Sequence, residues 1–239
     1  MKKLLLVVLL AVAVVACKKT NNVSASILVY NASWSANGIT MALNGTPIIA
    51  QPIAQGSSSG TADSPYIKIP AGTNNITVNT GSSVLVDKNV YASAAFGNSF
   101  ILFDTSVQQR PTRILQLSDD LSLPDTFRIK YRVLNLVPDT AVKVDILLVN
   151  GSTDSLPLVT NGSFAGNTVS ASTLQSFTAV PYHGENYSIK IKKAGTGELY
   201  TTLNYPFSIQ GIYSIIFSGL PAGNAGAGLK LTVLRHPAS

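Results

Sequence analysis

The sequence predicts an all-β protein in which two tandem Greek-key β-sandwich domains follow an N-terminal export signal. Three observations lead to this prediction. An apolar run from Leu4 to Ala16 follows two lysines and ends at the only cysteine, Cys17. Beyond it, short apolar segments with a period of two are separated by turn residues, without helical periodicity. Blocks of the first half also recur, in the same order, in the second half.

Residues 1–16 have the composition of a signal peptide. Lys2 and Lys3 form the basic start, thirteen apolar residues form the core, and the small Ala16 precedes the expected cut. Thirteen residues are too few to cross a bilayer, which takes about 20. We therefore expect the segment to be removed. The 223 residues that remain are enough for two domains of roughly 100 residues or for one large β-domain.

The end of this segment, Val14-Val15-Ala16-Cys17, resembles the lipobox of bacterial lipoproteins. The resemblance implies that the Cys17 thiol receives a diacylglycerol, that the chain is cut before Cys17, and that the new amine is acylated. Two or more acyl chains anchor a protein stably where one does not. Residues 17–25 would then be a lipidated tether. An ordinary secretory signal with a chance cysteine and a signal-anchor helix are the alternatives. Val15 departs from the usual alanine or serine.

The composition excludes some classes of function. Charged residues are 12% of the chain, about half the usual share. The net charge of +6 falls to +4 without Lys2 and Lys3, and the remaining basic residues are scattered. Nucleic-acid binding is therefore not expected, because it needs a concentrated basic patch. With Cys17 lipidated there is no intrachain disulfide, so burial and hydrogen bonding must hold each domain.

The first domain is expected over residues 24–120. Its segments alternate as Tyr66-Ile67-Lys68-Ile69 does, and Asn44-Gly45 predicts a type I′ hairpin because both central positions of that turn need positive φ. Gln55 to Ser64 is polar and rich in Gly and Ser, so a loop is expected there. The predicted strands are Ser26–Ala32, Ile39–Leu43, Pro65–Pro70, Asn75–Asn79, Val84–Tyr91, Ser99–Asp104 and Thr112–Leu117.

The second domain is expected over residues 126–236, after a connector between Leu117 and Thr126. Phe100–Phe103 in the first domain is apolar throughout and Ile212–Phe217 in the second is mostly apolar, which predicts central strands covered on both faces. The predicted strands are Ile129–Val133, Val142–Ile146, Tyr187–Lys192, Ile212–Phe217 and Leu229–Leu234.

Four blocks of the first domain match blocks of the second, which predicts an internal duplication. The alternative is a chance match between turn-rich strands. Longer loops are expected in the second copy, mainly between Ser152 and Ser176. The matched pairs are Leu28–Asn31 with Arg132–Asn135, Leu43–Gly45 with Val149–Gly151, Ile69–Gly72 with Val180–Gly184, and Gly97–Ile101 with Gly211–Ile215.

The first strand, the Asn-Gly hairpin, the strand-Pro-x-Gly turn and the late apolar strand resemble an uncharacterised family of tandem immunoglobulin-like repeats. This domain of unknown function occurs in exported bacterial lipoproteins of the Bacteroidetes type. The resemblance covers nearly the whole mature chain. It implies two tandem immunoglobulin-like Greek-key sandwiches held by lipid in the cell envelope, with the outer membrane as the expected location and its periplasmic or surface face left open. It implies no activity and no cofactor.

The sequence does not predict an enzyme. A Ser/His/Asp triad would have to use one of only two histidines, and no G-x-S-x-G motif is present. His183 is expected to serve a turn, and His236, three residues from the C-terminus, is expected to be disordered. A surface hydrolase with paired carboxylates stays open as an alternative function.

No metal site is expected either. Two distant histidines and a lipidated cysteine form no zinc cluster. Asp119, Asp120 and Asp125 lie within seven residues and carry the oxygen ligands that calcium prefers, but the EF-hand pattern is absent. We interpret these aspartates as solvated acids of the connector.

Carbohydrate binding is the remaining small-ligand hypothesis. Aromatic rings stack on sugar faces, and Trp34 is the only tryptophan of the chain. Tyr66, Tyr91 and Tyr182 would join it if the fold gathers them. The alternative is that Trp34 is a core or edge residue. The sequence therefore predicts a non-catalytic binding or structural module of the cell envelope, attached to the membrane by lipid, with surface proteins or glycans as candidate partners.

Overall fold

The computed structural model describes residues 23–61, 64–107, 112–139, 141–151, 154–165, 176–184, 186–220 and 228–238. The predicted signal peptide and Cys17 lie outside these residues. Within the described part of the chain, no helix is long and apolar enough to span a membrane.

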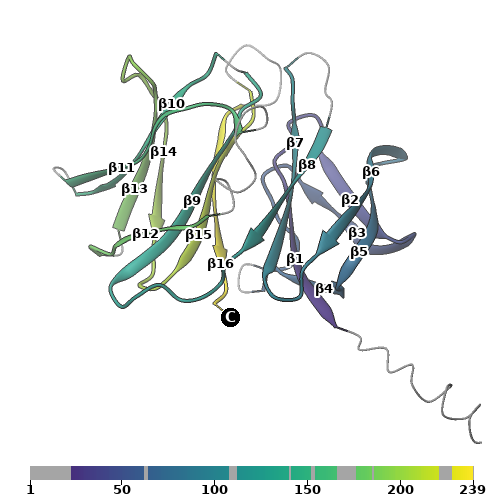
Figure 1. Cartoon of the computed structure of the whole chain (residues 1–239). Helices are drawn as coiled ribbons and strands as arrows, with labels where there is room; N and C mark the ends of the chain where they lie inside the picture. Colours follow the sequence, from purple (N-terminus) through teal and green to yellow (C-terminus); the bar gives the residue numbers. More distant parts are fainter. Residues whose placement is uncertain are drawn as a thin grey trace, which may run out of the picture.

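The first domain is a sandwich of two four-stranded sheets (Figure 1). One sheet has the order β4-β1-β7-β8 and the other the order β3-β2-β5-β6. The central pair β1 and β7 is parallel, and the other neighbours are antiparallel. The strands are β1 (Ser24–Asn31), β2 (Gly38–Leu43), β3 (Thr46–Ala54), β4 (Ile67–Pro70), β5 (Gly72–Thr80), β6 (Ser83–Ala92), β7 (Gly97–Asp104) and β8 (Thr112–Asp119).

The second domain repeats this topology strand for strand. Its sheets have the orders β12-β9-β15-β16 and β11-β10-β13-β14, and β9 and β15 are again parallel. The two sandwiches confirm the predicted all-β fold. The strands are β9 (Arg128–Leu136), β10 (Val144–Asn150), β11 (Asp154–Gly162), β12 (Thr178–Pro181), β13 (Asn186–Lys193), β14 (Leu199–Pro206), β15 (Ile212–Ser218) and β16 (Lys230–His236).

Some strands that contain proline or carry few apolar residues were not predicted from the sequence. β3 contains Pro47 and Pro52, and β11 contains Pro157. Both are edge strands, where a missing backbone N–H breaks no sheet ladder on the open side. β11 lies within the segment between Ser152 and Ser176, where a longer loop was expected. The edge strand β14 was missed too, and β12 was recognised only as part of a repeat block.

Each sandwich has its own hydrophobic core, and a third core lies between the two domains. Every residue of β7 and of β15 is buried. Burial on both faces was predicted for these strands, and the third core supplies the second face. It joins side chains of β1, β7 and β8 to side chains of β9 and β15 and to the segment after β11. Its buried members are Leu28, Tyr30, Ala32, Ile101, Phe103, Leu117, Leu134, Leu136, Phe164, Ala165 and Ile216.

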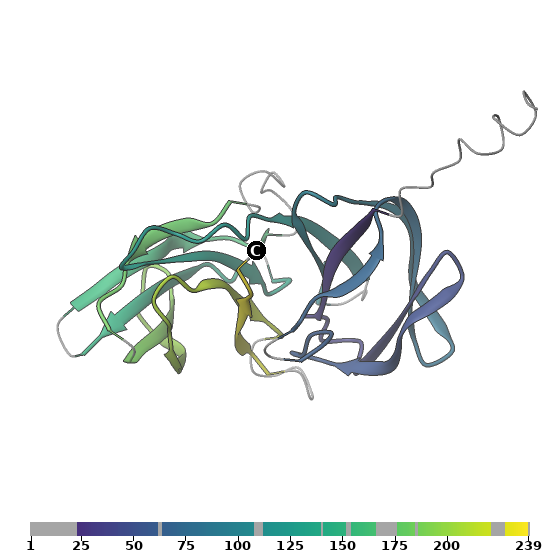
Figure 2. The same cartoon turned by 90° about the horizontal axis from the view of Figure 1, so that it is seen from below.

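The molecule therefore has four layers, with the sheets of β1 and β9 in the middle (Figure 2). β1, β7, β9 and β15 all begin at one end of the molecule, and β8 and β16 end there (Figure 1). We call this end the base. The start of β1 and the end of β16 both lie at the base (Figure 1).

Candidate functional site

The strand register places equivalent residues of the two copies at the interdomain face. Ser99 on β7 lies beside Leu28 on β1, and Ser214 on β15 lies beside Arg132 on β9. The two serines are thus equivalent, one residue away from the sequence match that paired Ser99 with Tyr213. Asp119 and His236 are equivalent as well, because they end β8 and β16 opposite the first residues of β7 and β15.

These positions build a buried polar ring between the domains, close to the base. Three members come from the first domain and three from the second. Five of the six are at most 3% exposed as whole residues, and the sixth, Tyr66, has a hydroxyl bonded inside the ring. The polar ring consists of Tyr66, Ser99, Asp119, Arg132, Ser214 and His236.

Arg132 is the hub of the polar ring. Its Nη1 lies 2.7 Å from Asp119 Oδ1 in a buried ion pair. Its Nε donates to Ser214 Oγ at 2.7 Å, and its Nη2 donates to Ser99 Oγ at 3.1 Å. The guanidinium carbon also lies 4.7 Å from the centre of the Phe177 ring, in a cation–π contact. Every side of the guanidinium group is thus occupied by protein.

The remaining bonds close the ring through His236. Asp119 Oδ2 accepts hydrogen bonds from Tyr66 Oη at 2.6 Å and from Ser99 Oγ at 2.7 Å. His236 lies with Nδ1 2.7 Å from Tyr66 Oη and with Nε2 2.7 Å from Ser214 Oγ. The hydrogen-bond path therefore crosses the domain interface and closes on itself. It runs from Arg132 through Ser214, His236, Tyr66 and Asp119, and the Asp119 carboxylate pairs with Arg132 again.

For a neutral His236, only one arrangement of protons satisfies all of these bonds. Tyr66 donates its hydrogen to Asp119, so its oxygen accepts from Nδ1–H of His236. The unprotonated Nε2 then accepts the hydroxyl hydrogen of Ser214, whose oxygen accepts from Arg132. The ring therefore places the proton of a neutral His236 on Nδ1.

The electrostatics agree with a neutral histidine. Burial lowers the pKa of His236 from 6.5 to about 4; the negative charge of Asp119 opposes this shift and Arg132 adds to it. Burial also raises the pKa of Tyr66 far above its usual range, and Asp119 adds to that shift. The polar ring therefore contains one anion and one cation, Asp119 and Arg132, and its other members are neutral.

Further from the base, Tyr30 makes a second polar contact between the domains. Its buried hydroxyl faces the side chains of Thr232 and Ser218 in the second domain. Burial raises the pKa of Tyr30 to about 12, so the hydroxyl keeps its proton. Polar groups of the two domains thus lie near each other both close to the base and further from it.

Two expectations for these residues were wrong. His236 was expected to be disordered, but it is the last residue of β16 and 2% exposed. Asp119 was expected to be a solvated connector acid, but it belongs to β8 and is fully buried. Asp120 and Asp125 are exposed, and Asp120 pairs with Lys130 at 3.0 Å. Among the described residues, no group of three or more His, Cys, Asp or Glu side chains could hold a metal.

A signal for the polar ring was present in the sequence. Lys130 and Arg132 alternate with Ile129, Tyr131 and Val133, which indicates a polar face on β9. At Arg132 this polar face packs against the other domain. A single sequence cannot distinguish solvent from a second domain as the cover of a polar face.

The contact between Ser214 and His236 resembles a catalytic dyad, but its surroundings oppose catalysis. Ser214 is fully buried, and Arg132 donates to the same oxygen that would attack a substrate. His236 Nδ1 is bonded to Tyr66 rather than to a carboxylate. A nucleophile needs room for a substrate beside it, and here the facing domain occupies that room.

The buried carboxylates do not form a hydrolase pair. Asp104 ends β7, and Asp119 lies opposite the first residue of β7, so the two are about 23 Å apart at ~3.3 Å per residue. Paired carboxylates of glycosidases lie about 5–9.5 Å apart. Asp104 and Asp119 are also both hydrogen-bonded to protein donors.

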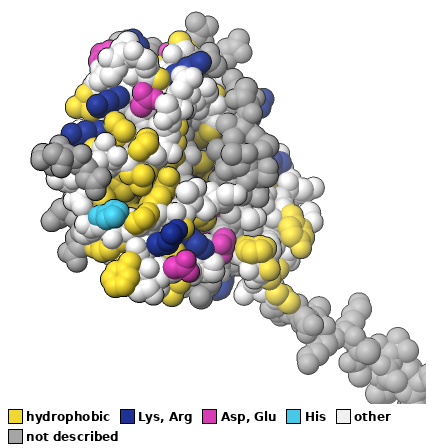
Figure 3. All heavy atoms as spheres, turned by 60° about the vertical axis from the view of Figure 1, so that its left-hand side comes forward, with side chains coloured by type: hydrophobic (Ala, Val, Ile, Leu, Met, Phe, Trp, Pro, Cys, Tyr) yellow, Lys and Arg dark blue, Asp and Glu magenta, His cyan; other side chains and the backbone are white. Residues whose placement is uncertain are grey.

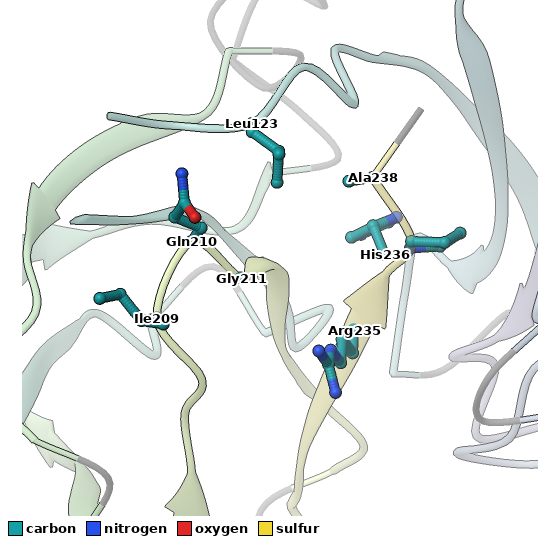
Figure 4. A pocket seen from close by; sticks show the side chains of 8 residues that line it. Leu123, Ile209, Gln210, Gly211, Arg235, His236 and Ala238 are labelled. Carbon is teal, nitrogen blue, oxygen red and sulfur yellow. The ribbon is translucent and has the colours of Figure 1, made fainter. Parts of the chain in front are cut away.

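A cavity of about 370 Å³ opens beside the polar ring at the base (Figure 4). Leu123 of the connector, Gln210 of the turn before β15, and Arg235 and His236 of β16 line it. In Figure 4 these side chains come from three separate segments and surround the opening. Gln210 Nε2 donates to the carbonyl of Pro124 at 3.1 Å, which ties the turn to the connector.

The three aromatic residues predicted to bind ligand lie in three different environments. Tyr66 belongs to the polar ring, and its hydroxyl contacts Asp119 and His236. Tyr91 lies on β6 and is 63% exposed. Trp34 is half-buried in the segment after β1. Tyr182 contacts the ring of Tyr187 in the second domain.

The segment that carries Trp34 is held by a buried carboxylate. Asp104 Oδ2 accepts from Ser33 Oγ at 2.8 Å and from the Ser35 backbone N–H at 3.0 Å. Asp104 Oδ1 accepts from the hydroxyls of Ser35 and Thr112, both at 2.9 Å. The equivalent position in the second copy is Gly219, so this arrangement belongs to the first domain alone.

Fold and site together define a two-sandwich all-β protein whose junction is a structural polar ring. No protein-family model matches the sequence, and no curated protein is significantly similar to it. Membership of the family that the sequence resembles therefore stays a prediction.

Three solved structures show distant similarity. A candidate cell adhesion protein from Bacteroides fragilis matches with 11% identity and a TM-score of 0.25, over 85% of each chain. The fimbrial anchor protein Mfa2 from Porphyromonas gingivalis matches with 10% identity and a TM-score of 0.24, over 88% of this chain and 98% of that one. A leucine-rich repeat protein from Bacteroides thetaiotaomicron matches with 9% identity and a TM-score of 0.19, over 80% of this chain and 26% of that one. These scores are too low to indicate a shared fold.

Proposed function

We propose that this protein is a non-catalytic lipoprotein of the bacterial cell envelope, in which two sandwiches act as one rigid body. The body presents its loops to a protein or glycan partner. The observation that carries the proposal is the shared interdomain core with its polar ring. The buried charged groups of the junction, Asp119 and Arg132, bind each other across the interface, so neither is available to a substrate.

The rigidity follows from what separation of the domains would expose. Domains of one chain move relative to each other unless their interface is large and hydrophobic. Here separation would expose the eleven residues of the third core and would remove Asp119 from Arg132. A loop on one domain therefore keeps a fixed position relative to loops on the other, which suits a scaffold that positions a binding surface.

The lipid anchor rests on the lipobox-like segment that ends at Cys17. Metabolic labelling with an alkyne fatty acid tests it directly. We expect the wild-type chain to be labelled and a Cys17→Ala variant to be unlabelled. An unlabelled wild type would overturn the lipoprotein assignment.

Calorimetry of the folded chain tests the rigid body. We expect one cooperative unfolding transition for the wild type, because neither sandwich keeps its inner face covered alone. Two separated transitions in the wild type would show that the domains are independent, and the scaffold proposal would then fail.

Glycan binding at Trp34 is a second candidate function, favoured by the three hydrogen bonds that Asp104 accepts from Ser33 and Ser35 on either side of it. An aromatic side chain on a fixed segment loses little conformational entropy when it stacks on a ligand. A glycan array with wild type, Trp34→Ala and, as a matched aromatic control, Tyr91→Ala tests this function. Loss of a signal in Trp34→Ala alone supports it, and no signal for the wild type contradicts it.

A further inference from the structure

Exposed apolar side chains concentrate at the base of the molecule. Nine large hydrophobic residues are exposed in the described part of the chain. Single exposed apolar residues are normal, whereas a group at one end needs an explanation. Five of the nine lie in segments at the base, and both domains contribute. These five are Val23, Phe96, Leu123, Phe127 and Ile209.

The register fixes the position of these segments. Val23 precedes β1, and its carbonyl accepts from the Ala71 backbone N–H at 2.9 Å. Phe96 precedes the first residue of β7. Leu123 and Phe127 belong to the connector between β8 and β9, and Ile209 lies in the turn before β15. Figure 3 shows hydrophobic side chains on either side of a group of charged side chains at the lower end of the molecule.

Phe127 gives an independent indication that the base has a role. Its φ is +61°, a backbone conformation that bulky residues rarely adopt, and its side chain is 68% exposed. The backbone is held in place, because the Phe127 carbonyl accepts from the Tyr182 N–H at 2.8 Å. Asn or Gly would fit this conformation with less strain. A strained residue that offers an aromatic ring to solvent indicates a function for the ring.

The charges at the base favour an anionic partner. Basic residues there outnumber exposed acids, of which Asp120 and Asp125 are the two in the connector. Lys18 and Lys19 in the expected tether add two more positive charges. The basic residues in the described segments at this end are Lys68, Arg128, Lys130 and Arg235.

The length of chain before β1 places the base near the membrane. Five residues separate Cys17 from Val23. Six extended residue steps of about 3.3–3.6 Å reach roughly 20 Å. A lipid on Cys17 would therefore hold the base, and not the opposite end, beside the headgroups.

We propose that the base is a membrane-contact surface, on which Phe96, Leu123, Phe127 and Ile209 enter the headgroup region of an anionic leaflet. The inference rests on the proposed lipid anchor, which brings the surface to the membrane. Apolar side chains flanked by basic ones fit this interface, because it is apolar in depth and negatively charged at its surface. The contact would fix the orientation of the rigid body and direct its far loops away from the membrane.

Vesicle sedimentation tests the surface without the lipid. The chain from Lys18 onward retains every described residue. We expect it to bind vesicles of phosphatidylcholine with phosphatidylglycerol, and to bind at least tenfold more weakly as a Leu123→Gln/Phe127→Asn variant. Asn tolerates the left-handed backbone at position 127, so the fold is kept. The matched control is Val84→Gln/Leu199→Gln, which alters exposed apolar residues outside the base and should bind as the wild type does.

The lipidated full-length chain provides the second measurement. Because Cys17 is the only cysteine and would be blocked by lipid, a cysteine introduced at position 123 or 199 can be labelled alone. Brominated lipids should quench a fluorophore at position 123 and leave one at position 199 unchanged. Equal quenching, or equal vesicle binding by wild type and base variant, overturns the inference. Retention of the wild-type chain by an envelope protein in detergent, with no vesicle binding, would assign the base to a protein partner instead.

The two proposals can fail separately. If Cys17 is labelled but the chain neither binds vesicles nor shows selective quenching, the lipid anchor is supported and the membrane-contact surface is rejected. If Cys17 is unlabelled but the chain binds vesicles, the lipid anchor is rejected and the membrane-contact surface is supported.

Discussion

Asp119 and His236 occupy equivalent positions in the two copies and meet at one hydroxyl group. Tyr66 Oη lies 2.6 Å from Asp119 Oδ2 and 2.7 Å from His236 Nδ1. The same structural position thus holds an anion in one copy and a neutral base in the other. Because the Tyr66 hydroxyl bridges them, the protonation of His236 is coupled to the stability of the domain interface.

Stability should fall as the pH drops below 6.5. Burial lowers the pKa of His236 to about 4 in the folded chain, while the unfolded chain keeps a value near 6.5. Between these values the unfolded state binds the additional proton, so the free energy of unfolding decreases as the pH falls. The full effect is on the order of 3 kcal/mol. Urea unfolding of wild type and His236→Gln between pH 7 and 4 checks this, and the variant should show a flatter profile.

Removal of Arg132 should be strongly destabilising. Arg132→Met leaves the buried carboxylate of Asp119 without its cation, which costs about 3–5 kcal/mol. Arg132→Met/Asp119→Leu should recover much of that loss, because no charge stays buried. Denaturant unfolding measures both variants. The control is Lys130→Met, whose partner Asp120 is exposed, with an expected loss below about 1 kcal/mol. Similar losses for Arg132→Met and the control would contradict the role of the ring.

Gly97 should tolerate no larger side chain. A Cβ atom there would lie 3.0 Å from Tyr66 Cε1 and 3.0 Å from Leu121 Cδ1. Gly97→Ala should therefore displace the Tyr66 ring and lower stability by about 1–3 kcal/mol. Gly228→Ala is the matched control, because no atom lies within 4 Å of the added methyl group. Thermal unfolding of the two variants distinguishes crowding from a general effect of alanine.

Asp104→Ala should release the segment around Trp34. The substitution removes the acceptor of four hydrogen bonds and leaves the buried Ser33 hydroxyl short of a partner, at a cost of about 1–3 kcal/mol. Because Trp34 is the only tryptophan, its fluorescence reports on this segment directly. We expect a red-shifted emission and faster quenching by acrylamide. An unchanged spectrum would show that other contacts hold the indole.

The sequence was informative where local chemistry decides the structure. The Asn-Gly hairpin at Asn44 has both residues at positive φ, at 48° and 80°, as the turn type requires. The alternating segments formed strands, and the apolar runs of β7 and β15 became central strands. β3 escaped recognition because its prolines are tolerated only at a sheet edge, and edges are defined by tertiary pairing.

The site could not be predicted because it exists only between the domains. The members of the polar ring lie between positions 66 and 236, and each half of the chain provides three of them. His236 gave no periodic signal of its own. Its equivalence with Asp119 follows from the pairing of β16 with β15, which extends the repeat beyond the last matched sequence block.

The two copies meet through the same face of the same sheet, which is the arrangement of an isologous dimer joined into one chain. The position of Leu28 in the first copy holds Arg132 in the second, and the position of Asp119 holds His236. The two faces are therefore chemically unlike, and a pairing of either copy with itself would lack the ion pair. The buried ion pair therefore favours the pairing of each copy with its covalent neighbour over the pairing of two identical copies.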